Sequence, residues 1–373
     1  MQFIDLHRQY ETIKSQIEED LSKVLEHKQF IMGPEVKLLE KRLGEYTGVK
    51  HVISCASGTD ALVIPLMAYG LSKTDAVFVP SFTFFASAES ISLAGGTPVF
   101  VDCDRDTFNM SVESLKEAIE TVRKEGLLIP RGIIAVDLFG LPANFEEIRK
   151  TADENNLFLL EDGAQGFGGT ISTQKACSFG DIAATSFFPA KPLGCYGDGG
   201  AIFTNDDELA EKINSIHVHG QGVDKYDNIR IGLNSRLDTF QAAILNRKLD
   251  IFDNEMKQRN KIADLYCREL RSVVEIPVIP TNYCSSWAQF TIKTKDTEVR
   301  DRLMKKLKEK HIPTAIYYAT PIHLSSAYKE HLQAKIDMRN TEEICKKVLS
   351  LPMHPYLLEE EIKIICDTIR ENC

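Results

Sequence analysis

The chain has 373 residues, which is enough for two or three domains or for one large α/β domain with a smaller appendage. Lys and Arg number 44 and Asp and Glu number 54, so the formal net charge is −10, which argues against nucleic acid or an anionic membrane as the main partner. The N-terminus is charged too early for a signal peptide, and no stretch approaches the roughly 18 apolar residues of a membrane-spanning helix, so we expect a cytoplasmic protein.

The nine cysteines are scattered without a Cys-x-x-Cys pair, which favours reduced thiols over a disulfide framework or a zinc site. His217 and His219 would share one face of a strand, but no cysteine or carboxylate cluster lies near them in the sequence. We therefore expect no metal and interpret both as ordinary hydrogen-bonding histidines.

Helix and strand signals alternate over the first two-thirds of the chain. Apolar side chains recur at helical spacing over residues 8–28, and Pro34 after Gly33 marks the first position of a second helix. Short apolar runs then predict strands at His51–Cys55, Ala76–Pro80, Pro98–Val101, Gly132–Leu138, Leu157–Leu160, Ile182–Phe188 and Ala201–Thr204. This alternation predicts a mainly parallel sheet that is covered by helices on both faces.

The last third of the chain has a different pattern. Leu233 to Ile276 contains neither glycine nor proline, which predicts one long or kinked helix that starts near residue 235 and enters a second domain. Beyond it we expect strands at Trp287–Thr294 and Ala315–Tyr318 and helices at Val299–Lys310 and Glu359–Arg370. The predicted domains are a large α/β domain over residues 1–245, which includes the N-terminal helices, and a small α+β domain over 246–373.

A candidate anion site follows the first predicted strand, where Ser57-Gly58-Thr59 opens a helix. The free amides of a helix N-terminus and the helix dipole favour a phosphate. Taken alone, such a segment is more often an ordinary helix cap. It lacks the lysine of a nucleoside-triphosphate loop and the G-x-G-x-x-G of a dinucleotide site, so neither of those ligands is favoured.

A carboxylate and a lysine follow two later strands. Asp162 lies just past Leu157–Leu160, at the carboxyl edge of the sheet where α/β proteins bind ligands, although a helix-capping aspartate is a common alternative. Lys191 stands between Pro189 and Pro192, after another strand. Most lysines are solvated surface residues, but desolvation beside rigid backbone lowers an ammonium pKa and frees the amine as a nucleophile.

These three elements together fit one cofactor, pyridoxal 5′-phosphate (PLP). It needs a phosphate cup, a lysine for a Schiff base and a carboxylate beside its pyridine nitrogen. Lys191 would form the Schiff base and Asp162 would keep the ring nitrogen protonated. Phe84 would stack on the ring, and core packing is an alternative role that is compatible with stacking. The residues expected to hold the phosphate are Ser57, Gly58, Thr59 and Ser186.

The chain resembles the DegT/DnrJ/EryC1/StrS family of sugar-nucleotide aminotransferases, which are PLP enzymes of fold type I with a large seven-stranded sheet domain. The resemblance runs nearly end to end. It is carried by Gly33–Glu35, Ser57–Leu62, Glu161–Gln165, Ser186–Lys191, Gly232–Asp238 and Gln241–Leu245. So many matches in the same order form a specific signal, although no single match does.

The resemblance implies roles for further residues. Gln165 would contact the ring hydroxyl of PLP, and Asn234 would reach the phosphate from the neighbouring subunit, which implies a homodimer with shared active sites. The implied reaction transfers an amino group from L-glutamate to a keto-sugar nucleotide. The residues expected to face that sugar nucleotide are Met32, Gly33, Arg236, Tyr317, Tyr318 and His323.

Within the family, the runs Ser186–Asp207, Asn234–Leu245 and Leu351–Tyr356 are similar to those of enzymes that aminate C3 of UDP-2-acetamido-2-deoxy-3-oxo-D-glucuronate for surface polysaccharides such as O-antigen. One departure concerns the sugar, because those enzymes have a His-Tyr-Pro pattern where this chain has Tyr317-Tyr318-Ala319. Other 3-keto or 4-keto UDP-, dTDP- or GDP-sugars therefore remain alternatives. A non-catalytic, regulatory PLP protein is a further alternative, against which the complete set of site residues argues.

Overall fold

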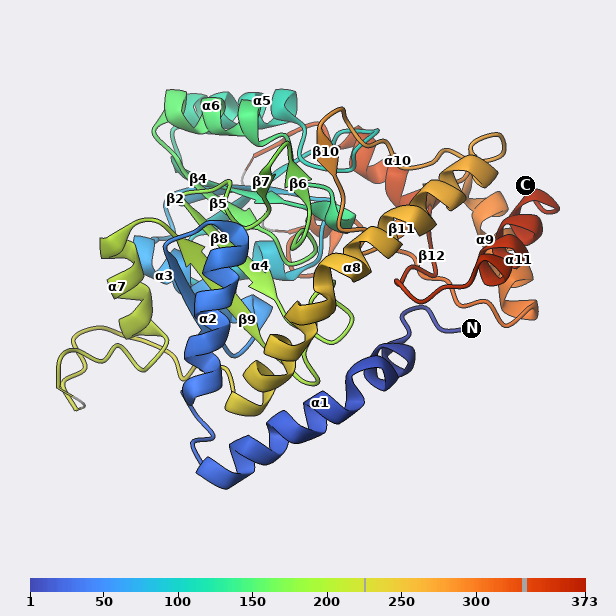
Figure 1. Cartoon of the computed structure of the whole chain (residues 1–373). Coiled ribbons are helices and arrows are strands. Elements are labelled where there is room, and N and C mark those ends of the chain that lie inside the picture. The colour runs from blue at the N-terminus through green and yellow to red at the C-terminus, as the bar shows by residue number, and fades with distance from the viewer. Residues whose placement is uncertain (225, 331–333) are drawn as a thin grey trace.

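The computed structural model describes residues 1–224, 226–330 and 334–373. Its large domain is built on a seven-stranded sheet in the order β1-β9-β8-β5-β4-β2-β3 (Figure 1). The strands are β1 His51–Cys55, β2 Asp75–Pro80, β3 Thr97–Val101, β4 Ile129–Val136, β5 Phe158–Asp162, β8 Ile182–Ser186 and β9 Gly200–Thr204. Only the two pairings of β9 are antiparallel in this sheet, so the mainly parallel sheet predicted from the sequence is confirmed.

Helices cover both faces of this sheet because side chains of a buried strand alternate between them. In β2, Val77 and Val79 pack with α3, α4 and α7, whereas Ala76 and Phe78 pack with α5 and α6. The second face is completed beside β8 and β9 by α2 and the first half of α8. The helices are α2 Pro34–Thr47, α3 Gly58–Tyr69, α4 Ala86–Leu93, α5 Val112–Glu125, α6 Phe145–Asn155 and α7 Asp207–Ile216.

The long helix predicted after residue 235 is α8, which spans Thr239–Leu270 and begins after Asp238. It runs from the sheet domain into the small domain, with α1 (Leu6–His27) along its first part (Figure 1). Arg8 near the start of α1 pairs with Glu361 of the last helix at 3.0 Å, so the N-terminus reaches the small domain. Where one domain ends and the other begins within α8 stays a prediction.

The small domain packs its helices around a two-stranded antiparallel sheet and the second half of α8. Tyr266 of α8 and Phe290 of β11 lie in its core, with ring centroids 4.8 Å apart. The elements are β11 Phe290–Lys293, β12 Val348–Leu351, α9 Thr297–Glu309, α10 Arg339–Lys347 and α11 Glu359–Arg370. Shorter elements elsewhere are strands β6 Thr170–Ile171, β7 Gln174–Lys175 and β10 Tyr283–Cys284, and 3-10 helices η1 Leu138–Gly140 and η2 Ile322–Leu324.

The strand predicted at Ala315–Tyr318 is wrong. Only Ala315 pairs, in an isolated bridge with Ser350 of β12, and the strand that does pair with β11 is β12 itself. The chain leaves the sheet after Ala315 because Tyr318 turns toward the large domain and bonds there to Gln165. No helix among the described residues is long and apolar enough to span a membrane.

Candidate active site

The predicted cofactor residues gather at one edge of the large sheet. Because β9 runs antiparallel between β1 and β8, Gly200 lies opposite both Cys55 and Ser186. Asp162 at the end of β5 lies opposite Ala184 of the neighbouring strand. The carboxyl ends of β1, β5 and β8 therefore bring the start of α3, Asp162 and Ser186 to the same edge.

The start of α3 and Ser186 form a cradle that leaves no space for a side chain between them. A Cβ added to Gly58 would lie 2.5 Å from Cβ of Ser186, so only glycine fits here. Ser57 caps the helix by accepting a 3.1 Å hydrogen bond from the amide of Asp60. The cradle fits the phosphate of PLP, since helix N-terminal amides and a serine hydroxyl meet in it.

Asp162 is a buried carboxylate, 4% exposed. Its Oδ2 accepts a 2.7 Å hydrogen bond from the hydroxyl of Ser87 and its Oδ1 a 3.2 Å bond from the amide of Ala164. Burial raises the pKa of Asp162, and the hydrogen bonds and the charge of Lys191 oppose that rise. It has no cation within 4 Å in the described part of the chain. Such a carboxylate suits a protonated ring nitrogen.

Lys191 stands on a loop that the protein holds in place. Its amide donates to the carbonyl of Phe188 at 2.8 Å. From α8, the Nζ of Lys248 donates to the carbonyl of Gly194 at 2.6 Å, and Gln241 accepts from the amide of Tyr196 at 2.9 Å. Burial lowers the pKa of Lys191, and the charge of Asp162 opposes this. The lowered pKa increases the fraction of free amine.

Gln165 connects the sheet edge to the small domain. Its Oε1 accepts from the amide of Phe139 at 2.6 Å, and its Nε2 donates to the hydroxyl of Tyr318 at 3.2 Å. The ring of Phe84 lies 6.4 Å from that of Tyr318 and is 55% exposed, which leaves it available for stacking. The ring of Tyr317 lies 5.7 Å from that of Tyr318 and packs edge-on against Phe3 at 6.2 Å.

Asn234 and Arg236 lie together on the surface beside the start of α3. Nη2 of Arg236 donates to Oδ1 of Asn234 at 2.6 Å, and Arg236 forms no ion pair within the described ranges. Between them, Ser235 is fully buried, donates to Asp60 at 2.6 Å and accepts from the amide of Ala56 at 3.2 Å. Ser235 thus anchors a segment whose polar side chains face outward.

The other predicted substrate residues have different surroundings. Met32 is exposed, and Gly33 donates its amide to Oγ1 of Thr239, 3.1 Å away, which places this loop beside the start of α8. His323 is 4% exposed. Its Nδ1 lies 2.6 Å from the hydroxyl of Ser81 and its Nε2 3.4 Å from Glu342, so both ring nitrogens already face protein groups.

Two residues that contact the candidate site and support its geometry were not predicted from the sequence. Ser87, which bonds to Asp162, lies on α4, and no local signal distinguishes it from the other serines of that helix. Ser235 lies within Gly232–Asp238, the segment already singled out, but its partner Asp60 is remote in the sequence. Neither contact is visible without the fold.

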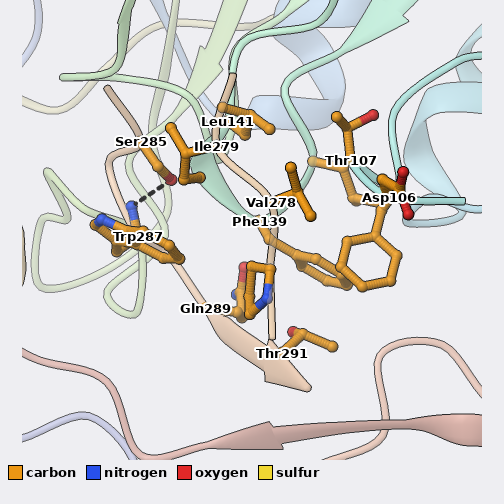
Figure 2. Close-up of a pocket in the computed structure, with 13 residues that line it drawn as sticks. Asp106, Thr107, Phe139, Leu141, Val278, Ile279, Ser285, Trp287, Gln289 and Thr291 are labelled. Carbon is orange, nitrogen blue, oxygen red and sulfur yellow. Dashed lines mark hydrogen bonds between the residues drawn. The ribbon is translucent and has the colours of Figure 1, made fainter. Parts of the chain in front are cut away.

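A separate cavity lies between the domains, with an empty volume of about 280 Å³ that includes its open mouth, and none of the predicted site residues line it (Figure 2). Trp287, Val278 and Leu141 are among its mostly apolar lining residues. Phe139 also lines it, while the amide of Phe139 donates to Gln165. The cavity therefore lies behind the wall of the candidate active site rather than in it.

Comparison with known proteins relates this arrangement to one family. The model of the DegT/DnrJ/EryC1/StrS aminotransferase family matches residues 11–370. The chain is 44% identical to UDP-2-acetamido-2-deoxy-3-oxo-D-glucuronate aminotransferase of Pseudomonas aeruginosa, over 98% of each protein.

Two solved structures are similar as well. A DegT DnrJ EryC1 StrS aminotransferase from Brucella abortus has 50% identity and a TM-score of 0.97, covering 100% of this chain and 99% of that one. NtdA from Bacillus subtilis, with bound cofactor PMP, has 30% identity and a TM-score of 0.88, covering 99% and 82%. Because the family model covers nearly the whole chain, this protein belongs to the DegT/DnrJ/EryC1/StrS aminotransferase family.

Proposed function

We propose that this enzyme uses PLP to transfer the amino group of L-glutamate to the 3-keto group of UDP-2-acetamido-2-deoxy-3-oxo-D-glucuronate. The observation that carries the proposal is the meeting of Lys191, Asp162 and the Gly58–Ser186 cradle at one sheet edge. The 44% identical Pseudomonas aeruginosa enzyme supports the choice of substrate.

Each residue of the candidate site has its own proposed role. The amides at the start of α3 and the hydroxyl of Ser186 would hold the phosphate, and Asp162 would keep a proton on the ring nitrogen. The Nζ of Lys191 would hold the cofactor and serve as acid and base at the reacting carbon. Gln165, which is hydrogen-bonded to Tyr318, would contact the ring hydroxyl. When bound, PLP would supply an electron-withdrawing ring for the transfer of the amino group.

Arg236 is the proposed contact for the sugar nucleotide. Its guanidinium is bonded to Asn234 but has no carboxylate partner in the described part of the chain, and Asp238 does not pair with it. A planar guanidinium binds a diphosphate or a uronate carboxylate at two points. Met32 lies on the neighbouring loop, beside the start of α8. Tyr318 is hydrogen-bonded to Gln165 of the same chain and so borders the cofactor site of its own subunit.

We further propose a cytoplasmic homodimer in which Asn234 completes the phosphate site of the partner, and a product that enters a surface polysaccharide such as O-antigen. The outward position of Asn234 supports the shared site. So do the exposed apolar side chains of Phe30, Ile31 and Met32, since such a patch on a protein surface commonly marks an interface.

A panel of keto-sugar nucleotides tests the substrate. Each would be incubated with the enzyme and L-glutamate, and the aminated carbon would be identified by NMR. The proposal requires that the 3-oxo-glucuronate is preferred and that nitrogen appears at C3. A preference for a 6-deoxy-4-keto sugar would replace the uronate by another member of the same substrate class.

A further inference from the structure

A small polar cavity borders Lys191 on the side of the small domain. Its walls come from segments that lie far apart in the sequence, namely the N-terminal residues 4–9, the lysine loop, α8 and the residues after β12. The cavity measures about 260 Å³ including its mouth. Between the side chains it has room for about one water-sized group, the size of one carboxylate oxygen.

Buried polar atoms at this cavity lack partners. Arg259 of α8 is 4% exposed and His354 is 1% exposed. Nη1 of Arg259 donates to the carbonyls of Trp287 and Met353 at 3.0 and 3.3 Å, but its Nε has no hydrogen-bond partner, and neither ring nitrogen of His354 has one. Because buried polar groups are nearly always hydrogen-bonded, this cluster points to a ligand that supplies partners.

The charge of Arg259 is also unpaired within 4 Å across the described ranges. Of the two carboxylates nearby, Glu255 lies one turn before Arg259 on α8, and its charge opposes the lowering of the Arg259 pKa by burial, but the two form no ion pair within 4 Å. The oxygens of Glu255 accept hydrogen bonds from Gln9 at 2.9 and 3.1 Å and from Tyr356 at 2.6 Å, and Asp5 pairs with Arg8 at 3.3 Å. A buried guanidinium without a paired carboxylate favours an anion, and its planar fork matches a carboxylate.

We propose that this cavity binds the α-carboxylate of the amino-acid donor. The donor's amine must reach Lys191, which forms one wall, and the carboxylate is attached to the same carbon as that amine. This inference rests on the transamination proposed above and adds where the donor is held.

Glutarate, which is glutamate without its amine, tests the site without any reaction. Calorimetric titration of the holoenzyme should show that Arg259→Gln weakens glutarate binding about 10- to 100-fold, as expected for the loss of hydrogen bonds to a charged group. Arg259→Lys should recover part of the affinity. Arg300→Gln is the matched control, because Arg300 also donates to two carbonyls but lies outside the cavity. It should bind glutarate like the parent.

Transamination has two half-reactions, one with the amino-acid donor and one with the sugar nucleotide. Measuring them separately shows whether Arg259 binds the carboxylate of the donor or that of a uronate sugar. In stopped-flow single turnovers, Arg259→Gln should raise the Kd for glutamate by the same factor as for glutarate. The half-reaction with the amino-sugar nucleotide should stay within about twofold of the parent. Equal losses in both half-reactions would contradict a donor site, as would unchanged glutarate and glutamate affinities in a folded variant.

A second variant keeps the test decisive if Arg259→Gln fails to fold. His354→Phe keeps a ring of similar size but removes both nitrogens, and it should weaken glutarate binding about tenfold. Parent-like binding in His354→Phe would contradict the proposal. Should the parent enzyme reject every keto-sugar nucleotide while Arg259→Gln still loses glutamate affinity, the donor site stands and the proposed sugar substrate fails.

Discussion

The hydroxyl of Ser87 donates a 2.7 Å hydrogen bond to Oδ2 of Asp162, and this bond opposes the rise in the pKa of Asp162 that burial causes. A residue of α4 thus helps to keep the carboxylate at the end of β5 ionised. An ionised Asp162 would hold a proton on the ring nitrogen. Its role can therefore be tested by one variant that removes the carboxylate and by a second that removes only its hydrogen bond from Ser87.

Asp162→Asn should reduce turnover by about 10²-fold or more, because a neutral amide stabilises a protonated ring nitrogen far less than a carboxylate does. Ser87→Ala should have a milder effect. Without the hydroxyl the pKa of Asp162 rises further, so the acid limb of the pH–rate profile should move to higher pH. Steady-state rates between pH 5 and 9 measure both effects. Parent-like turnover in Asp162→Asn would assign the ring proton to another group.

Lys191→Ala should remove turnover, by at least about 10²–10⁴-fold, while the fold remains intact. The variant loses both the attachment point and the group that moves the proton, although PLP can still bind through its phosphate. Initial rates and the visible absorption spectrum measure the effect. Lys175→Ala is a matched control, since burial also lowers the pKa of Lys175 but this lysine lies over Tyr46, outside the site. Near-normal rates in Lys191→Ala would refute the cofactor assignment.

Mixed dimers test whether the active sites are shared. If Asn234 serves the partner's phosphate site, Lys191→Ala and Asn234→Ala proteins should each be badly impaired alone. A mixture that has exchanged subunits should regain part of the activity, because one of the two sites in each hybrid carries both native residues. Mass spectrometry of the mixture would confirm the exchange. Absence of rescue in proven hybrids would mean that each site belongs to one subunit.

Arg236→Lys distinguishes two contacts with the sugar nucleotide. Lysine keeps the charge but loses the two-point geometry. If Arg236 binds the uronate carboxylate, kcat/KM should fall about tenfold or more for the 3-oxo-glucuronate and less for the same sugar without the carboxylate. Equal losses on the two substrates would assign Arg236 to the diphosphate or to the fold.

Asp137 and Glu161 form a buried carboxyl pair beneath the site. Burial and their mutual repulsion raise the pKa of Asp137, and burial raises the pKa of Glu161 to about 7. The folded state therefore binds more protons than the unfolded state above the ordinary carboxyl pKa, so this pair costs stability as the pH rises toward 7 and beyond. Oδ2 of Asp137 has no hydrogen-bond partner.

Asp137→Asn should consequently raise the Tm relative to the parent more at pH 8 than at pH 5. At pH 8 the parent loses the proton that the two carboxyl groups share, whereas the amide N–H of the variant stays directed at Glu161. Thermal unfolding at both pH values, followed by circular dichroism, measures the difference in Tm between variant and parent. Asp102→Asn is the control. Asp102 accepts from the amides of Asn340 and Thr341 at 3.0 and 2.8 Å, so its amide variant should be less stable at both pH values. A Tm difference for Asp137→Asn that does not change with pH would refute a shared proton.

The sequence predicted the structure best where a run of apolar residues marks a strand and a chemically distinctive side chain follows it. The apolar runs predicted the strands of the large sheet, and the position of Asp162 just past one of them indicated the edge where the candidate site lies. Ser186 fell inside the predicted strand Ile182–Phe188, whereas β8 ends at Ser186. The small domain was less predictable, because β12 is a short apolar run that pairs with β11 only through tertiary contacts. The cavity at Arg259 was not predictable at all, since it depends on carbonyls of Trp287 and Met353 brought to α8 by the fold.

Helix α8 begins three residues after Arg236 and carries Arg259 some five turns later. A continuous helix is stiff along its axis, so a displacement at Arg259 when the donor binds would be transmitted to the segment that holds Asn234. If Asn234 serves the neighbouring subunit, donor binding in one subunit would alter cofactor affinity in the other. The two halves of a dimer would then behave as unequal sites, with a first molecule of glutamate changing the apparent affinity for the second.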